Sequence, residues 1–562
     1  MHPERDVSDD PTNRTAIAVN QVGYSPAATK HAIVVADATD ASTFAVVDTD
    51  GGDVVYEGAL SAPIVDPDAG ETVRHADFSD LDEVGTYVVR AGGAESHPFG
   101  INPDVYAPVL RDVGRLYTLK RSNTRIDDHR TGLDIAPGHP QDAAASLAAG
   151  DDYHDAGATL DVVGGWYDAG DYGKYVPPAA VTVAQHLLAY DLYPEAFDSG
   201  QYDAPEGVEM GAGDVPDVLA EARVELEWLE SMQRPDGACY HKVAGASWPA
   251  MDVRPAEDDQ PRYVFGHSTF GTAQYAGAMA LAARVYADVD PAFADRALAN
   301  AREAFDYLAD TPDSVFRFDE GQDDGSGPYR KETDDAERFW AAAELLRTTG
   351  DMRYRDPLHD EHADGFDVPV TPVTWRNTRA LGQWAYRSAD AADPERAVAL
   401  DDAFRAYADD LVASVAADGY RVALDTDDYH WASTKLALAK GCLLLFADEI
   451  DGDERYVEAA FDQLHYALGR TPTGYSYVTG AGANPPWNPH DRHVVSTGTS
   501  LPGMLVTGAN ANGDDDALAA YIERESPPPA KAYVDETASY AANEWAIDYT
   551  APLLLVLARS RQ

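Results

Sequence analysis

The chain has few lysines, few cysteines and no long apolar run. Lysine occurs eight times in 562 residues, and 97 acidic residues stand against 42 lysines and arginines, so the formal net charge is −55. Such a surface repels nucleic acid and anionic membranes, which excludes both as partners. Apolar residues still make up 45% of the chain, which argues against disorder. We interpret the composition as halophilic, because molar salt shortens the Debye length to about 3 Å and screens the self-repulsion.

The number of cysteines and the N-terminal sequence are the two features that bear on the cellular location of the protein. The two cysteines, Cys239 and Cys442, cannot form a disulfide framework. The segment Met1–Val7 has no basic region, no apolar region and no twin arginines, so no export signal is visible. No apolar run approaches the roughly 20 residues that span a bilayer. We expect a soluble protein, and the sequence leaves open whether it acts in the cytoplasm or is secreted after removal of a signal.

Residues 15–102 have the pattern of a small all-β sandwich. Short apolar segments alternate with turn signals, among them Asp50-Gly51-Gly52, which is typical of a hairpin. The expected strands are Thr15–Tyr24, His31–Asp37, Thr43–Asp48, Val54–Leu60, His75–Phe78 and Gly85–Ala91. A segment of this length and pattern suits two packed sheets. Residues 1–14 before it are predicted to be a disordered acidic tail.

Residues 103–562 have helical periodicity from Pro103 to the end of the chain. Apolar residues recur at three- and four-residue spacing, and proline or aspartate marks several helix starts, as at Asp290-Pro291. The expected helices are 104–121, 178–192, 215–233, 269–287, 293–309, 335–348, 376–388, 396–415, 431–448, 455–468 and 546–559, with one more near 500–521. This approaches the twelve helices of an (α/α)6 barrel. We therefore expect a multi-domain chain in which an all-α barrel follows the sandwich.

The segment Trp166–Tyr175 carries the strongest chemical signal. It places Asp168 and Asp171 three residues apart, after Gly164-Gly165 and among four aromatic residues. The D-x-x-D spacing by itself is common on the solvated surface of an acidic chain. Aromatic faces can stack on a sugar ring, and Gly170 and Gly173 are expected to let the backbone turn tightly and come close to it. The flanking residues therefore favour two carboxylates that act on a water beside a sugar.

A third carboxylate, Glu544, lies where a polar loop meets the last apolar helix. Partial desolvation there could raise its pKa into the range of a general acid. The same position also suits a glutamate that is stabilised by the helix dipole, so this segment alone leaves both readings open. Upstream, the loop 475–493 carries Trp487, His490 and Arg492 among glycines and prolines. It is either a surface loop or a source of hydrogen-bond donors for sugar hydroxyls.

Six segments of the helical region form an ordered set: Gly164–Tyr175, Asp217–His241, Asp335–Asp351, Asp428–Trp431, Leu464–Arg492 and Tyr533–Ala551. Together they resemble glycoside hydrolase family 9. Asn20-Gln21-Val22-Gly23-Tyr24 and Ala76-Asp77-Phe78-Ser79 resemble the immunoglobulin-like module that precedes the catalytic domain in one branch of that family. The resemblance implies an (α/α)6 barrel that hydrolyses β-1,4-glucans with inversion at the anomeric carbon.

The resemblance also implies catalytic roles. Asp171 would be the general base that deprotonates the attacking water, and Asp168 would help to hold this water. Glu544 would be the acid that protonates the leaving oxygen. Inverting hydrolysis requires base and acid carboxyls roughly 6.5–9.5 Å apart to admit the water. We therefore expect Asp168 and Asp171 to cluster, with Glu544 across a cleft.

Further residues are implied to bind the sugar. Those expected to line the subsite next to the cleaved bond are His241, His490, Arg492 and Tyr549. Trp375 and Arg379, four residues apart on one expected helical face, resemble the family's aromatic and basic contacts on the leaving-group side. Core packing is the alternative for this pair. Trp431 is expected in the pocket wall.

Metal sites recur in the family, although the chemistry requires no cofactor. The candidate calcium ligands are Asp334, Asp335 and Glu337, because they follow a glycine-rich segment and offer the oxygen ligands that calcium prefers. A solvated acidic loop is the alternative. Some relatives carry zinc on cysteines near the positions of Ser122 and Tyr153-His154. This chain has no cysteine there, so zinc is not expected.

The leading hypothesis is a salt-adapted endo-β-1,4-glucanase, a cellulase that acts as a monomer on β-glucan chains. The alternative within the same fold is an exo-acting β-glycosidase on oligosaccharides, such as a glucosidase, cellobiohydrolase or glucosaminidase. A third reading is a non-catalytic carbohydrate-binding protein. That reading requires the loss of a catalytic carboxylate, and Asp168, Asp171 and Glu544 are all present.

Overall fold

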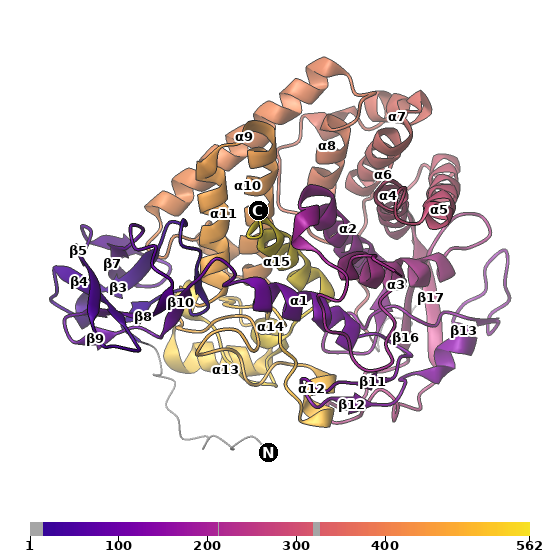
Figure 1. The fold of residues 1–562 in the computed structure, drawn as a ribbon. Coiled ribbons are helices and arrows are strands. Elements are labelled where there is room, and N and C mark those ends of the chain that lie inside the picture. Colours follow the sequence, from indigo (N-terminus) through magenta and orange to yellow (C-terminus); the bar gives the residue numbers. More distant parts are fainter. Residues whose placement is uncertain (1–14, 212, 318–325) are drawn as a thin grey trace.

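The computed structural model describes residues 15–211, 213–317 and 326–562. The predicted tail, residues 1–14, lies outside this range. A β-sandwich and a barrel of helices lie side by side, and α11 (Glu454–Ala467) is the barrel helix next to the sandwich (Figure 1). Within the described residues, no helix combines the length and the apolar character needed to cross a membrane.

Two sheets form the sandwich, and their facing side chains make one apolar core. The first sheet has the order β1–β3–β7–β6, and the second has the order β2–β10–β8–β4–β5 with β9 beside β8. The strands are β1 (Ile17–Ala18), β2 (Gly23–Tyr24), β3 (His31–Val35), β4 (Thr43–Asp48), β5 (Val54–Ala59), β6 (Ile64–Asp66), β7 (Glu71–Asp77), β8 (Gly85–Ala91), β9 (Ala94–Glu95) and β10 (Phe99–Ile101). Val46 of β4 pairs with Val89 of β8, and both are buried. The predicted hairpin at Asp50-Gly51-Gly52 is confirmed, because it joins the antiparallel β4 and β5.

The motif Asn20–Tyr24 breaks one expected strand and attaches the sandwich to the barrel. The Asn20 carboxamide oxygen accepts the N–H groups of Val22 and Gly23, at 2.9 and 3.1 Å. This turn separates β1 from β2, so the single strand predicted at Thr15–Tyr24 was wrong. The other end of the Asn20 amide lies 2.9 Å from Nδ1 of His465 on α11. The motif is therefore a structural joint between the two units.

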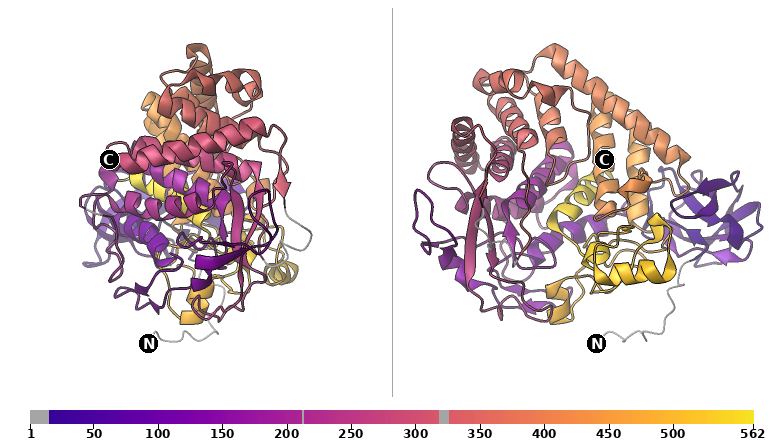
Figure 2. Two further views of the ribbon diagram at one scale, coloured as in Figure 1. Left: turned by 90° about the vertical axis from the view of Figure 1, so that its right-hand side faces the viewer. Right: turned by 180° about the vertical axis from the view of Figure 1, so that it is seen from behind.

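The barrel has an inner and an outer ring of helices (Figures 1 and 2). The inner ring consists of α2 (Val176–Leu192), α4 (Thr269–Val285), α6 (Asp335–Thr349), α8 (Arg379–Arg387), α10 (Ser433–Asp451) and α15 (Ile547–Arg559). The outer ring consists of α1 (Ala107–Leu119), α3 (Asp217–Ser231), α5 (Pro291–Asp310), α7 (Arg355–Asp360), α9 (Pro394–Ala417) and α11. Inner α4 is buried on every side from Thr269 to Ala283, whereas outer α5 buries a single stripe. The predicted (α/α)6 barrel is confirmed.

One end of the barrel carries a sheet and three short helices, and the sequence predicts only one of these helices, near 500–521, which α13 overlaps from Asp516 onward. The sheet has the order β14–β13–β17–β16–β15 with β18 beside β17. Its strands are β13 (Ala145–Leu147), β14 (Thr159–Leu160), β15 (Lys174–Tyr175), β16 (Tyr240–Gly245), β17 (Arg262–Ser268) and β18 (Phe316–Arg317). The short helices are α12 (Arg492–Thr497), α13 (Asp516–Glu525) and α14 (Tyr540–Asn543). Because β15 completes the segment Trp166–Tyr175, the sheet fixes one end of the candidate site.

Candidate active site

The segment Trp166–Tyr175 is anchored at its start by two glutamates of α3. The Trp166 backbone N–H donates to Glu225 Oε2 at 2.6 Å, and the indole N–H donates to Glu221 Oε1 at 2.8 Å. Trp166 and both glutamates are fully buried. Gly164 and Gly165 precede them with φ of 90° and 74°, a conformation that favours glycine. The entry to the segment is therefore set by long-range hydrogen bonds and by a glycine turn.

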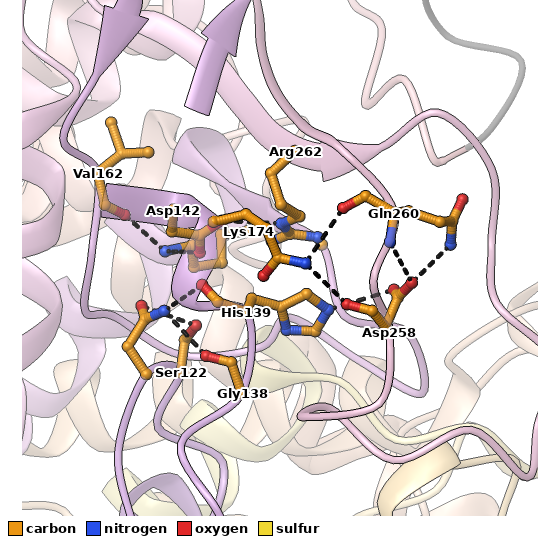
Figure 3. A network of polar contacts seen from close by, with 12 residues as sticks. Ser122, Gly138, His139, Asp142, Val162, Lys174, Asp258, Gln260 and Arg262 are labelled. Atoms are coloured by element: carbon orange, nitrogen blue, oxygen red, sulfur yellow. Dashed lines mark hydrogen bonds and ion pairs between the residues drawn. The ribbon is translucent and has the colours of Figure 1, made fainter. Parts of the chain in front are cut away.

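A buried charge network anchors the other end of the segment (Figure 3). Lys174 Nζ lies 2.9 Å from Asp142 and donates to the carbonyls of Val162 and Gly164. Arg262 of β17 donates to the second oxygen of Asp142 at 2.8 Å. Although burial opposes ionisation, Arg262 and Lys174 hold the pKa of Asp142 well below its usual range. The Asp142 carboxylate therefore stays charged, with one oxygen paired to Lys174 and the other to Arg262.

Asp168 and Asp171 lie between these anchors, and each accepts a different tyrosine hydroxyl. Tyr329 donates to Asp168 Oδ2 at 2.5 Å. Tyr175 donates to Asp171 Oδ2 at 2.8 Å, and the Gly173 N–H donates to the same oxygen at 3.0 Å. Burial and the neighbouring Asp171 carboxylate raise the pKa of Asp168 well above its usual range. The surroundings of Asp168 therefore favour its neutral form more than water would.

Glu544 reaches the same segment from the loop between α14 and α15. Its Oε1 accepts, at 3.2 Å, the N–H of Gly170, which lies between Asp168 and Asp171 in the sequence. Burial and the Asp171 carboxylate raise the pKa of Glu544 to about 8, although the Gly170 N–H opposes this shift. The carboxyl groups of Asp168, Asp171 and Glu544 thus belong to, or contact, the same short stretch of backbone. With a pKa of about 8, Glu544 keeps its proton at neutral pH.

The two glycines of the segment make room for other groups. Neither Gly170 nor Gly173 has a positive φ, so the expected tight turn is not the reason for them. A Cβ on Gly170 would lie 2.2 Å from the His490 carbonyl oxygen and 2.9 Å from Glu544 Oε1. A Cβ on Gly173 would lie 2.3 Å from the Tyr175 hydroxyl. Each glycine therefore permits a close approach that the carboxyl groups depend on.

The loop before α12 and the first residue of this helix contact Gly170 as well. Arg492 donates to the Gly170 carbonyl from its backbone N–H at 3.1 Å and from its guanidinium at 2.9 Å. The His490 Nδ1 lies 2.7 Å from the Thr537 carbonyl oxygen, and burial lowers the pKa of this histidine. His490 and Arg492 therefore lie beside Gly170, between the two aspartates in the sequence, and their role in sugar binding stays a prediction.

A buried lysine lies beneath these segments. Lys120, directly after α1, donates to Asp491 at 2.6 Å and to the Ala169 carbonyl at 3.3 Å. Its ammonium also lies 3.0 Å from His493 Nδ1 and 4.7 Å from the centroid of the Trp545 ring. Although burial opposes ionisation, Lys120 and its neighbours hold the pKa of Asp491 at about 2. One cation therefore joins three segments that are far apart in the sequence.

The other predicted sugar-binding residues occupy different surroundings. Tyr549 and Trp431 form one contact, in which the indole N–H donates to the Tyr549 hydroxyl at 2.9 Å. Trp431 is 36% exposed, and its ring packs against the Tyr540 ring, with centroids 5.4 Å apart. His241 is fully buried, and its ring nitrogens lie 2.9 Å from Ser268 Oγ and 3.0 Å from the Pro328 carbonyl oxygen. This histidine holds the segment that leads to Tyr329.

Trp375 and Arg379 do not share a helical face. The helix α8 begins only at Arg379, because Thr374 and Asn377 exchange backbone hydrogen bonds in a turn and the Asn377 side chain accepts the Arg379 N–H. The predicted helix start at residue 376 was therefore wrong. Trp375 packs edge-on against Tyr329, with ring centroids 4.9 Å apart. The Arg379 guanidinium lies over the Phe339 ring instead.

The candidate calcium ligands are engaged by cations of the chain itself. Lys331 Nζ lies 2.5 Å from Glu337, and Arg338 Nε lies 2.9 Å from Asp334. Asp335 is exposed and heads α6. The described part of the chain contains no group of three metal-ligating side chains. Glu337 Oε1 is nevertheless buried with no hydrogen-bond partner among the described residues. The calcium site therefore stays a prediction; the glycine-rich stretch before these residues lies partly outside the described residues, since Gly325 is not described.

Polar groups of the chain also fill the neighbourhood of Ser122 (Figure 3). The Asn123 amide donates to the carbonyl oxygens of Gly138 and His139, at 3.0 and 2.7 Å. The His139 ring lies between the Tyr167 hydroxyl and Asp258. Burial lowers the pKa of His139 to about 4, which keeps the ring neutral. This network ties the segment Trp166–Tyr175 to β17 and its preceding loop.

Three side chains of the candidate site had not been predicted. Tyr329 and Tyr175 bond the two aspartates, and Lys120 joins the loops. Tyr329 lies at the end of the stretch interpreted as a calcium loop, and its φ of 43° has no sequence signal. Lys120 could have been noticed in the sequence, because lysine is so scarce in this chain. Six of the eight lysines are buried: Lys30, Lys120, Lys174, Lys242, Lys435 and Lys440.

Comparison with known proteins identifies relatives over almost the whole chain. A family model described as glycosyl hydrolase family 9 matches residues 106–557, and one described as cellulase N-terminal ig-like domain matches residues 12–96. Endoglucanase D of Acetivibrio thermocellus is 31% identical over 96% of this chain and 83% of its own length. A cellodextrinase of Butyrivibrio fibrisolvens is 31% identical over 96% of this chain and 98% of its own length. The crystal structure of GH family 9 endoglucanase J30 is 47% identical, with a TM-score of 0.93 over 96% of this chain and 99% of that one.

Proposed function

Because the chain belongs to glycosyl hydrolase family 9, we propose that it is an endo-β-1,4-glucanase that cleaves internal bonds of β-glucan chains. The proposal rests above all on Glu544, whose proton-retaining carboxyl bonds the turn between Asp168 and Asp171. The names of two relatives, Endoglucanase D and endoglucanase J30, support the same activity. The family had been recognised from the six segments, and the match over residues 106–557 confirms it.

The reaction needs one base and one acid. Asp171 would accept a proton from water as the water oxygen attacks the anomeric carbon. The glycosidic C–O bond would break on the opposite face, and the leaving oxygen would take the proton of Glu544. The buried oxygen Oδ1 of Asp168 has no hydrogen-bond partner among the described residues, which suits a role in holding the water. Inversion by this route yields the α-anomer first, which ¹H NMR of the initial product detects.

Sugar binding would involve the side chains that surround these carboxyl groups. His490 and Arg492 flank Gly170, and the partly exposed Trp431 donates its indole N–H to the Tyr549 hydroxyl. An aromatic face next to hydrogen-bond donors is a favourable surface for a pyranose ring. The chemistry requires no metal or other cofactor, and we propose that the enzyme acts as a monomer.

An exo-acting enzyme is the second candidate. One relative that aligns over almost its full length is a cellodextrinase, a name that points to short oligosaccharides. The two modes share the carboxyl groups and differ in where along the glucan the cut is made. Product analysis therefore separates them.

The first prediction concerns mode of action. On carboxymethyl-cellulose at molar salt, viscosity is expected to fall much faster than reducing ends appear, because internal cuts shorten the chains. Cellopentaose is expected to yield products of several sizes in chromatography. A single product size with unchanged viscosity would establish the exo-acting alternative instead. The same assay from about 0.1 M to about 3 M NaCl tests salt adaptation, because screening of the −55 charge should be required for full activity.

The second prediction concerns pH. The pKa of Glu544 is raised to about 8 in the folded protein, and only its protonated form can donate to the leaving oxygen. The value of kcat/KM, which reports the free enzyme, is therefore expected to fall as the pH rises through about 8. The measurement is the pH profile of kcat/KM on a soluble β-glucan. A profile that stays level up to about pH 10 would exclude Glu544 as the acid.

A further inference from the structure

Asp171 offers its two carboxylate oxygens to different surroundings. Oδ2 accepts two hydrogen bonds, from the Tyr175 hydroxyl at 2.8 Å and from the Gly173 N–H at 3.0 Å. Within residues 15–211, 213–317 and 326–562, Oδ1 has no hydrogen-bond donor, and the residue keeps 9% of its surface exposed. We propose that Tyr175 is a positioning residue: its hydroxyl holds Oδ2 in the fold and so presents Oδ1 to the attacking water. This inference rests on the proposed function, in which Asp171 is the base.

Tyr175 can only donate in this bond. Its side chain is 2% exposed, and burial raises its pKa well above the usual range, so the hydroxyl keeps its proton. Its ring packs against the Tyr329 ring, with centroids 4.8 Å apart, and Tyr329 donates to the other aspartate. The two rings therefore direct one hydroxyl to each carboxyl group. Asp168 and Asp171 cannot exchange donors without moving both rings.

Gly173 supports the same reading independently. Its φ is not positive, so its backbone conformation is open to any residue. A Cβ there would lie 2.3 Å from the Tyr175 hydroxyl and 2.5 Å from ring carbons of the same side chain. A distance below 3.0 Å forces the ring to shift. The glycine thus preserves the space through which Tyr175 reaches Asp171.

Other titratable groups lie around Asp171. The titratable groups that interact with it electrostatically come from every element packed on the segment: Lys120 after α1, Asp168, Tyr175 on β15, His490 before α12 and Glu544 before α15. Tyr175→Phe leaves all the charged ones in place and keeps the ring. A change in the pH profile of this variant therefore reports the loss of one hydroxyl donor.

The test is the pH profile of Tyr175→Phe. Loss of a donor makes the ionised carboxylate less stable, so the acid limb of kcat/KM is expected to move to higher pH by about one unit. Turnover is expected to fall about tenfold because the base is held less well, with KM little changed. Gly173→Ala, which displaces the same hydroxyl, is expected to move the acid limb in the same direction. The double variant should then add little to either single one.

Tyr172→Phe is the matched control. Tyr172 lies one residue after Asp171, and its buried hydroxyl donates to the Val253 carbonyl at 2.8 Å, the length of the bond under test. The acid limb of the kcat/KM profile of Tyr172→Phe is expected to lie at the same pH as in the parent. An unmoved acid limb in Tyr175→Phe would overturn the proposal, whatever the loss of turnover or thermal stability. If Asp171→Asn itself retained turnover, the proposed base would be wrong, and that result is separate from the Tyr175 profile.

Discussion

Asp171→Asn is expected to reduce turnover on β-glucan by about 10³-fold or more, with the fold intact. The substitution keeps the size of the side chain, and its amide oxygen can still accept the Tyr175 and Gly173 donors that bond Asp171 Oδ2. It removes only the ability to take a proton from water, and general-base catalysis contributes about 10²–10⁴-fold. The measurement is kcat at the pH optimum, together with thermal unfolding of parent and variant.

Asp161→Asn is the control for that experiment. Asp161 precedes the same segment and is exposed, so the same chemical change there is expected to leave both kcat and unfolding unaltered. Substantial turnover in Asp171→Asn would mean that another group is the base. Asp168 would then be the next candidate, because it lies in the same segment beside Asp171.

Glu544→Gln is expected to abolish cleavage of natural glucans but to spare substrates that need no acid. The glutamine oxygen can still accept the Gly170 N–H, so the loop keeps its hydrogen bond. Without a proton donor, a sugar leaving group departs poorly, and the expected loss is about 10²–10⁴-fold. An aryl β-cellobioside with an acidic phenol leaves without protonation, so its hydrolysis should fall far less.

The two substrates serve as each other's control in the same protein. A variant that has merely lost its fold or its sugar site would fail on both, whereas a missing acid affects only the natural glucan. The fall of kcat/KM above about pH 8 should also disappear in the variant, since the group with the raised pKa is gone. Equal losses on both substrates would exclude the acid role of Glu544.

Repeating patterns account for how much of the fold was predictable. The helices expected at 269–287 and 293–309 occur at Thr269–Val285 and Pro291–Asp310, because helical periodicity and capping residues are local properties. The strand expected at Thr15–Tyr24 failed for a local reason too, since the Asn20 side chain competes for backbone N–H groups. The end-cap strands are too short to have a period of their own, and β15 has only two residues.

The candidate site was predictable to a different extent. Trp166–Tyr175 and Glu544 were found because motif residues lie close together in the chain. Tyr329 was missed because it reaches Asp168 across 161 positions of sequence. The calcium site at Asp334, Asp335 and Glu337 stays a prediction, and the cations beside two of these residues, Arg338 and Lys331, can be recognised as partners only in three dimensions.

The sequence by itself determined the family, the sandwich and barrel, and the identity of the three carboxyl residues, since these depend on local periodicity and on short motifs. Only the tertiary structure decided their chemical states. The raised pKa values of Asp168 and Glu544 come from burial and from a shared neighbour, Asp171, although Glu544 lies more than three hundred residues away along the chain. Desolvation and charge act through space, so no pattern along the chain encodes which carboxyl group keeps its proton.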